Sequence, residues 1–291
     1  MSIMLDRVSY IYHPGTPFAR TALQELSLTI PEGEILGITG EVGAGKSTLL
    51  QLVNGLIRPV TGRVLVEGRN LAGMKKREMA AVRRRVGLVF QHPERQLFGY
   101  NVFDELAFGP RNAGLGRAET DERVEWALQA VGMPAAFKDR TISSLSAGER
   151  RRIAIAGVLA LKPAYLLLDE PTAGLDGEGI RRLTDTLQDI GGKPGNTIVI
   201  VSHNLRQLLG ISQRVVWLKE GRVWLDLRRE DIIDNYETLQ SSVMLPDTLK
   251  VMYGLNQRGW NLDPAALTPE TLGAAIASKL KENDSTQMNT D

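Results

Sequence analysis

Short apolar runs and segments of helical apolar spacing follow one another along much of this chain. The runs at 34–39 (EILGIT) and 165–169 (YLLLD) are apolar enough for buried strands of a parallel sheet. The segment at 47–55 (STLLQLVNG) follows the first run with helical apolar spacing and a glycine at its end. Buried strands that lead into helices predict an α/β fold.

The N-terminal segment has a different pattern. Residues 1–33 alternate between apolar and polar positions like strands around a loop at 13–20. Val8, Tyr10 and Tyr12 recur at period two, so they share one face of the expected strand.

The middle of the chain divides into strand-like and helical stretches. Residues 62–90 predict strands flanking a short basic segment, and residues 101–132 predict mainly helix. Core elements resume over 143–201 and end in short strands near 215–225.

The tail beyond residue 226 is distinct from the rest. Thr268 and Pro269 form a good helix start, and helical apolar spacing follows them. The last residues are polar, so we expect residues 283–291 to be disordered. The helices before them either cover the core or form a dimerisation module, and we favour dimerisation.

A glycine-rich loop at 40–48 (GEVGAGKST) carries the most specific chemistry. It fits the phosphate-loop pattern and lies between an expected strand and an expected helix. Gly43 and Gly45 allow backbone N–H groups to face anionic oxygens, and the helix N-terminus favours a phosphate. Lys46 can neutralise β- and γ-phosphate oxygens, and the Ser47 hydroxyl can ligate Mg²⁺. A glycine turn that binds nothing is the alternative, but the strand and helix around the loop argue against it.

A second element is the acidic pair that ends the strand at 165–169. Ligands bind at the carboxyl ends of strands in open α/β sheets. Asp169 is placed there to hold Mg²⁺, directly or through water, and Glu170 could polarise an attacking water. A strand that merely ends in two solvated acids is the alternative, and the phosphate loop makes it the weaker one.

The third element is the loop LSAGE at 145–149, just ahead of a predicted helix. Ser146 and Gly148 offer a hydroxyl and backbone N–H groups at the positive end of that helix, where phosphate can bind. Ser146 with Glu149 also fits an ordinary capping box. Both interpretations can hold at once.

Composition sets limits on the partners. The 291 residues carry a net charge of +1, so no strong overall field attracts nucleic acid or an anionic membrane. We interpret the basic runs at 83–85 and 150–152 as solvated helix faces. The sequence has no cysteine, no run of membrane-spanning length and no signal-peptide pattern at its start, so we expect a protein that is soluble by itself.

These motifs occur in a familiar order. The phosphate loop, Phe90-Gln91, LSAGE, LLLDEP, AGLD and Ser202-His203 follow one another as in ATP-binding-cassette (ABC) ATPases, which this sequence resembles over most of residues 1–227. The resemblance implies a P-loop ABC-type core with an antiparallel β subdomain, a helical subdomain at about 92–160 and ATP with Mg²⁺ as ligands. It also implies that Ser146, Ala147, Gly148 and Glu149 act on the nucleotide of a partner cassette.

The resemblance assigns further roles. Gln91 would ligate Mg²⁺ or water and sense a transmembrane subunit, Asp176 would lie at the dimer interface, and His203 would contact the γ-phosphate. Tyr12 would stack on adenine, with Tyr10 as an alternative. The expected catalytic residues are Glu170, His203 and Gln91, and the expected metal ligands are Ser47, Gln91 and Asp169. The expected nucleotide-binding residues are Tyr12, Gly40, Glu41, Val42, Gly43, Ala44, Gly45, Lys46, Ser47, Thr48, Ser146, Ala147, Gly148, Glu149 and Asp176.

Some positions depart from the family pattern. Ala147 and Glu149 replace a glycine and the glutamine of the usual LSGGQ, and Glu41-Val42 replace Pro-Asn. Gly177 follows the AGLD aspartate where proline is common. Glu149 puts a negative charge near a phosphate site, which would weaken closure of the dimer. None of these changes removes a group that does chemistry, so we expect an active site.

A finer resemblance comes from short stretches in three parts of the chain. QHPERQLF at 91–98 and DELAFGPRN at 104–112 look like the ATPases of energy-coupling-factor (ECF) transporters, which import vitamins or transition metals. LPDTL and LTPETL in the tail are similar to that group's C-terminal module, here residues 228–282. GTPFARTAL resembles the second ATPase of the shared-module form.

The resemblance implies a peripheral protein at the cytoplasmic face of the cell membrane. Its partners would be a second ABC ATPase, in a heterodimer or a homodimer, a transmembrane coupling subunit and a substrate-binding membrane subunit, with no nucleic acid. The alternatives are the ATPase of a dedicated cobalt, nickel or biotin transporter, that of another ABC transporter, and a soluble ABC ATPase acting on nucleic acid. The missing coiled coils and the single cassette argue against the last of these.

The segment after Gln91 predicts a docking site. Leu97 and Phe98 would receive a cytoplasmic helix of the transmembrane subunit, and Glu94 would pair with a basic residue on that helix. In the alternative interpretation Leu97 and Phe98 belong to the core and Glu94 is merely solvated.

Overall fold

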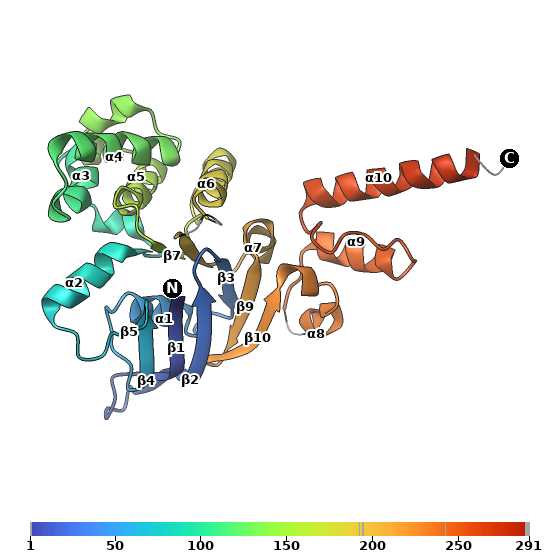
Figure 1. The fold of residues 1–291 in the computed structure, drawn as a ribbon, viewed down its shortest axis with the longest axis horizontal. Helices are drawn as coiled ribbons and strands as arrows, with labels where there is room; N and C mark the ends of the chain where they lie inside the picture. Colours follow the sequence, from blue (N-terminus) through green and yellow to red (C-terminus); the bar gives the residue numbers. More distant parts are fainter. Residues whose placement is uncertain (1, 192, 194, 242, 289–291) are drawn as a thin grey trace.

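The computed structural model describes residues 2–191, 193, 195–241 and 243–288, with side chains as far as residue 281. A mixed sheet forms the centre of this part of the chain (Figure 1). Its strands are β3 (Ile35–Gly40), β6 (Val86–Val89), β7 (Tyr165–Asp169), β8 (Thr197–Val201), β9 (Arg214–Lys219) and β10 (Arg222–Arg228). They lie in the order β10-β9-β3-β8-β7-β6, and every pair is parallel except β10 with β9. The expected α/β core is confirmed.

A smaller antiparallel sheet covers one side of the core. Its strands are β1 (Ser2–Tyr12), β2 (Arg20–Pro31), β4 (Thr61–Val66) and β5 (Arg69–Asn70). They lie in the order β2-β1-β4-β5. Bulges interrupt the pairing of β1 with β2, and the rings of Tyr10 and Tyr12 still meet edge to face with centroids 4.9 Å apart.

The helices fall into groups with different positions. Those beside the central sheet are α1 (Lys46–Val53), α2 (Lys76–Arg85), α6 (Gly177–Ile190) and α7 (Leu205–Ile211). A separate helical lobe, green in Figure 1, holds α3 (Val102–Asn112), α4 (Arg117–Ala130) and α5 (Ala147–Leu159). The short 3-10 helices η1 (Pro93–Gln96), η2 (Ala135–Asp139) and η3 (Ile142–Ser144) connect or flank them.

The C-terminal part is helical, as the sequence predicts. After η4 (Arg229–Asp231) come α8 (Tyr236–Gln240), α9 (Asp247–Asn256) and α10 (Pro269–Met288). Leu249, Met252 and Leu272 are buried and join the main core, while the far end of α10 extends away from the rest of the molecule (Figure 1). α10 continues to Met288, into the segment expected to be disordered, and residues 289–291 lie outside the described part.

The central sheet is buried on both faces. Along β7, Leu166 and Leu168 pack into the cluster shared with the helical lobe and the C-terminal helices. Tyr165 and Leu167 point the other way, into the cluster shared with the antiparallel sheet and α1. This double burial fixes the carboxyl end of β7, where Asp169 lies, between the two lobes. Among the described helices, none is long and apolar enough to cross a membrane.

Candidate active site

The phosphate-loop residues form a tight turn between β3 and α1. Gly40 and Gly45 have φ angles of 141° and 99°, in the region that favours glycine. A Cβ on Gly40 would lie 2.1 Å from the carbonyl oxygen of Leu218, and one on Gly45 would lie 2.5 Å from that of Ala22. The loop can therefore take this path only with glycine at both positions. Val42 is fully exposed at its tip, so the unusual residue there disturbs no packing.

Lys46 is held inside this loop. Its Nζ donates to the carbonyl oxygens of Gly40, at 2.7 Å, and Glu41, at 2.8 Å. Burial lowers the pKa of Lys46, and the carboxylates of Glu170 and Asp169 oppose that shift. The ammonium group is thus fixed where the N–H groups that begin α1 also point, which is an arrangement that suits phosphate.

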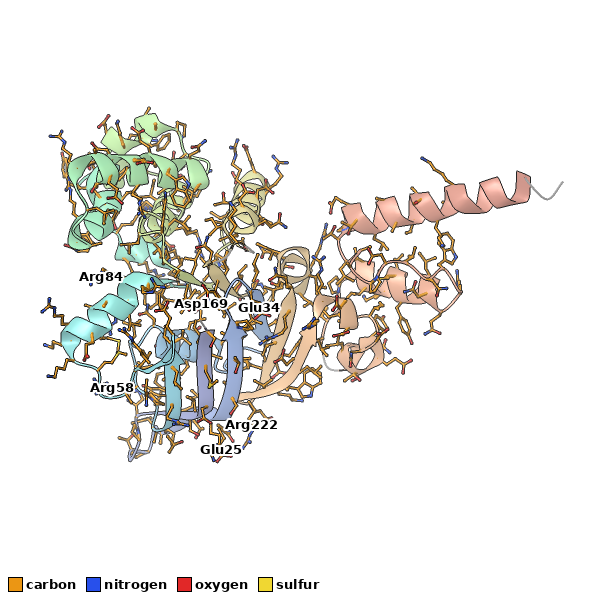
Figure 2. The ribbon with its side chains drawn as sticks, viewed as in Figure 1. Glu25, Glu34, Arg58, Arg84, Asp169 and Arg222 are labelled. Carbon is orange, nitrogen blue, oxygen red and sulfur yellow. The ribbon has the colours of Figure 1, made fainter. Side chains whose placement is uncertain are left out.

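The carboxyl end of β7 brings an oxygen ligand set to the phosphate loop. Asp169 is buried and labelled near the junction of the lobes in Figure 2, and the Ser47 hydroxyl lies close to its carboxylate. Burial raises the pKa of Asp169, while the nearby Ser47 hydroxyl lowers it. A hydroxyl and a carboxylate in contact are the hard oxygen donors that Mg²⁺ takes beside phosphate oxygens, so these residues fit the ion. The side chains of the described residues hold no cluster of three or more acidic, histidine or cysteine groups that could bind a metal without the nucleotide.

Glu170 lies in a strained and well-ordered position. Its φ angle is 49°, unusual for a residue other than glycine, and its N–H donates to the Val201 carbonyl oxygen at 2.9 Å. One carboxylate oxygen accepts the His203 N–H at 2.9 Å and lies 2.9 Å from His203 Nδ1. The other accepts from the Ser202 hydroxyl at 3.3 Å. A buried carboxylate beside an exposed imidazole is an arrangement able to accept a proton from water.

The loop at 145–149 is confirmed as a capping box. Ser146 is the N-cap of α5, and its Oγ accepts the Glu149 N–H at 3.3 Å. The Glu149 carboxylate in turn accepts the Ser146 N–H at 2.6 Å. Ala147 and Gly148 begin the helix, so their N–H groups have no carbonyl partner within it, and a Cβ on Gly148 would meet only open space. The loop can thus serve as a cap and bind phosphate at once.

This loop lies apart from the phosphate loop of its own chain. α5 packs against α3, α4, β6 and η1, whereas α1 packs against β2, β3, β4 and β7. In Figure 1 the two helices belong to different lobes. The structure therefore brings Ser47, Asp169, Glu170 and His203 to one site and leaves the LSAGE loop elsewhere.

Tyr12, Gln91 and Asp176 are further residues that the sequence predicted for the site. Tyr12 lines a small cavity with the phosphate-loop residues, and its hydroxyl lies 3.0 Å from Thr48 Oγ1. Tyr10 packs instead against the core. Gln91 follows β6, and Asp176 is the N-cap of α6, where its carboxylate accepts the Gly179 N–H at 2.7 Å.

The structure corrects the interpretation of the basic run at 150–152 as a solvated face. Arg151 is buried and donates to the backbone carbonyl oxygens of Gln91, at 2.9 Å, and Glu170, at 2.8 Å. It also faces the Glu94 carboxylate at 3.5 Å. One signal in the sequence could have revealed it: Arg151 precedes the buried Ile155 and Leu159 at four-residue steps, so it lies on the inner face of α5.

Glu94 has partners within its own chain. It faces Arg151, and one of its oxygens lies 3.4 Å from His92 Nδ1. The Arg151 guanidinium is the stronger attraction, because it is always charged and is buried. The pairing of Glu94 with a basic residue of a membrane subunit stays a prediction.

The sequence is similar to those of known ABC transporter proteins. A family model described as ABC transporter matches residues 23–173. The energy-coupling factor transporter ATP-binding protein EcfA2 of Symbiobacterium thermophilum is 46% identical, over 96% of this chain and 97% of that protein. A putative ABC transporter ATP-binding protein of Methanosarcina mazei is 43% identical, over 93% of this chain and 90% of that protein.

Solved structures show the same fold. The structure of cbiO1 from Clostridium perfringens, described as part of the ABC transporter complex cbiONQ, has a TM-score of 0.71 and 34% identity. The match spans 86% of this chain and 98% of the cbiO1 chain. The ATP-binding cassette MJ0796, solved as a dimer bound to ADP and Pi, has a TM-score of 0.72 and 27% identity. That match spans 78% of this chain and 98% of the MJ0796 chain.

Proposed function

Because this chain belongs to the ABC transporter family of ATPases, we propose that it is the ATP-hydrolysing subunit of an ECF-type importer for vitamins or transition-metal ions. One observation carries the assignment of the chemistry. The chain's own phosphate loop, Asp169 and Glu170 meet at one end of the central sheet, with Lys46 already inside the loop. The relatives named EcfA2 support the type of importer.

The catalytic roles follow from this geometry. The loop N–H groups and Lys46 hold the β- and γ-phosphates of ATP, and Tyr12 lies at the side of the loop where adenosine would extend. Ser47, Asp169 and the Gln91 side chain would hold Mg²⁺, which would supply positive charge to offset the charge on the phosphate oxygens. Glu170 accepts a proton as water attacks the γ-phosphorus and ADP leaves. His203 orients the Glu170 carboxylate and presents its second ring nitrogen to the γ-phosphate.

A complete site needs a second cassette. Ser146, Ala147, Gly148 and Glu149 would close over the nucleotide held by the partner's phosphate loop, with Asp176 at the interface. The distance between the two loops within this chain supports that arrangement. The partner is a related ATPase in a heterodimer, or a second copy of this chain. We assign residues 1–227 to nucleotide binding and 228–282 to dimerisation.

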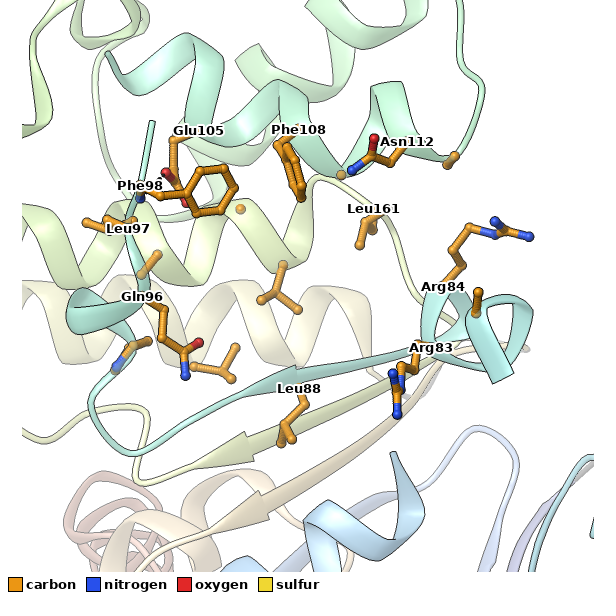
Figure 3. A pocket seen from close by; sticks show the side chains of 18 residues that line it. Arg83, Arg84, Leu88, Gln96, Leu97, Phe98, Glu105, Phe108, Asn112 and Leu161 are labelled. Atoms are coloured by element: carbon orange, nitrogen blue, oxygen red, sulfur yellow. Dashed lines mark hydrogen bonds between the residues drawn. The ribbon is translucent and has the colours of Figure 1, made fainter. Parts of the chain in front are cut away.

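A groove of about 700 Å³ lies beside η1 and could receive part of a membrane subunit. Leu97, Phe98 and Phe108 form one wall, and Arg83 and Arg84 lie at its other side (Figure 3). Phe98 is 65% exposed, so it does not belong to the core. We propose that a cytoplasmic helix of the transmembrane subunit docks here, which places the protein peripherally at the cytoplasmic face of the membrane. A separate membrane subunit would bind the transported substrate.

The dedicated form of transporter remains the second candidate. The solved relative cbiO1 supports this candidate, because its description makes it part of a named ABC transporter complex, cbiONQ. Co-purification decides between the two: a different ATPase in the captured complex indicates the shared module, and two copies of this chain indicate the dedicated form.

Substitution of the proposed base tests the chemistry. Glu170→Gln should leave ATP binding intact and lower turnover by at least about a hundredfold, because an amide accepts no proton from water. Lys46→Ala should weaken ATP binding itself. Both are measured in the assembled complex, as phosphate release and as binding of labelled ATP, with the exposed Glu119→Gln as control. Turnover close to normal in Glu170→Gln would refute the assignment of the base.

A further inference from the structure

The carboxylate of Glu149 is the one acidic group in the LSAGE loop, and it is turned back on its own helix. One oxygen accepts the Ser146 N–H at 2.6 Å, and the other lies 3.2 Å from the guanidinium of Arg140. The hydrogen bond from the Ser146 N–H is the largest cause that lowers the pKa of Glu149, and the Arg140 guanidinium lowers it further. The group is therefore a carboxylate with both oxygens engaged.

Arg140 is fixed by more than this ion pair. A second nitrogen donates to the Ser144 carbonyl oxygen at 3.0 Å, and the guanidinium lies 4.6 Å above the ring of Phe137. Arg140 thus joins the segment that enters the loop to the first turn of α5. The Arg140–Glu149 pair is partly exposed, with side-chain exposures of 38% and 21%, so it is a weak source of stability for the fold.

The arrangement leaves the backbone N–H groups at the start of α5 for a phosphate. Ser146 Oγ accepts the Glu149 N–H, and its hydroxyl also interacts with the Glu149 carboxylate. The N–H groups of Ala147 and Gly148 point out of the start of the helix. A carboxylate released from Arg140 could rotate toward these donors, where it would compete with a phosphate and repel it.

We propose that Arg140 is a positioning residue, which holds Glu149 away from the nucleotide of the partner cassette and offsets its charge. The proposal rests on the function proposed above and deepens it at the composite site. It explains how a loop with glutamate in its last position can still close over ATP. Glutamine there would need no such partner, so the demand for Arg140 depends on the charge of Glu149.

A double-mutant cycle in the assembled transporter tests this dependence. Arg140→Met should lower ATP turnover by on the order of tenfold, a coupling within the range of contacting groups. Glu149→Gln removes the charge that needs the partner, so its turnover is the reference, and the double variant should return to that level. Arg140→Lys, which retains the charge, should recover part of the turnover. Lys138→Met, which breaks an exposed ion pair with Glu125 nearby, is the matched control and should leave turnover unchanged.

The alternatives give other results. If Arg140 only braces the backbone through Ser144, Arg140→Met lowers ATP turnover by the same factor whether residue 149 is glutamate or glutamine. That result would refute the proposal. Gly148→Asp in the same assay tests the composite site itself, because it places a charge where the partner's γ-phosphate would lie. If Gly148→Asp retains full turnover, the loop does not act on nucleotide, and the proposed function of the loop falls together with this inference. Loss in Gly148→Asp without coupling between Arg140 and Glu149 overturns the inference alone.

Discussion

At the scale of the residue, Arg151 joins three parts of the site that the sequence keeps far apart. Its guanidinium donates to the carbonyl oxygens of Gln91 and Glu170 and faces Glu94. Because the φ angle of Glu170 is strained, its backbone needs support from its surroundings. Arg151 supplies that support from α5, so the segment that carries Gln91 and the residue that carries the proposed base share one anchor.

Removal of this cation should therefore affect stability and turnover together. We expect Arg151→Met to lower the free energy of unfolding by about 2–4 kcal/mol, since the Gln91 and Glu170 carbonyl oxygens each lose a donor and the Glu94 carboxylate loses its guanidinium partner. Arg152→Met, next to it on α5 and only half-buried, should change it by less than about 0.5 kcal/mol. Urea unfolding of both variants measures the difference. Equal midpoints for the two variants would contradict the anchoring role.

The single residues show what sequence can and cannot reveal. The loop at 40–48, Asp169 and Glu170 could be predicted because their chemistry depends on a fixed local spacing. The Glu170–His203 contact and the role of Arg151 depend on packing between segments distant in sequence. A run of arginines alone does not distinguish a solvated guanidinium from a buried one. The exposure of Arg151 was therefore predicted wrongly.

At the scale of the element, the groove beside η1 is formed where β6, α3 and α5 meet. Phe98 and Phe108 stand edge to face over it, with ring centroids 4.7 Å apart. Glu105 fixes the approach of the chain, because its carboxylate accepts the N–H groups of Phe98 and Gly99. The apolar wall is thus held open by α3, and it does not fold into the core.

An exposed aromatic held in this way should contribute strongly to docking. Phe98→Asp should weaken capture of the membrane subunits by about tenfold or more, as loss of an aromatic anchor does at interfaces. Phe18→Asp, at a ring that is even more exposed and lies in the loop before β2, should have no effect on capture. ATP binding should persist in both variants, because the phosphate loop is untouched. Normal capture by Phe98→Asp would remove the groove from the interface.

The elements themselves were largely predictable from apolar periodicity. The buried strands β3 and β7, the helices within 101–132 and the helical tail all appear where the pattern placed them. The order of the strands in the sheet could not be predicted from apolar periodicity, because it depends on how the strands and helices pack against one another.

At the scale of the whole molecule, the C-terminal helices extend the core sideways. Leu272 is buried, and Ala275 and Ile276 pack against the core, whereas Leu280 farther along α10 is 49% exposed. The helix thus begins as part of the fold and continues beyond it. This supports the proposed dimerisation module, since an apolar residue on a projecting helix can pack on a second cassette.

A negative charge at position 280 should weaken the association of the cassettes without affecting the folding of the chain. Leu280→Asp should leave the unfolding midpoint unchanged and shift the complex of two cassettes toward single chains by about tenfold in dissociation constant. Lys281→Asp next to it serves as a control for added negative charge. Sedimentation of the co-expressed cassettes measures the shift. An unchanged distribution would assign the tail to covering the core.

Lys46, described above as bound to the carbonyl oxygens of its own loop, has a consequence for the thermodynamics of ligand capture. A free lysine side chain loses up to about 2 kcal/mol of rotamer entropy when it becomes ordered. Here that loss accompanies folding, because Gly40 and Glu41 already fix the ammonium group. The loop therefore meets the nucleotide as a preorganised receptor, and the ordering of this side chain does not reduce the affinity.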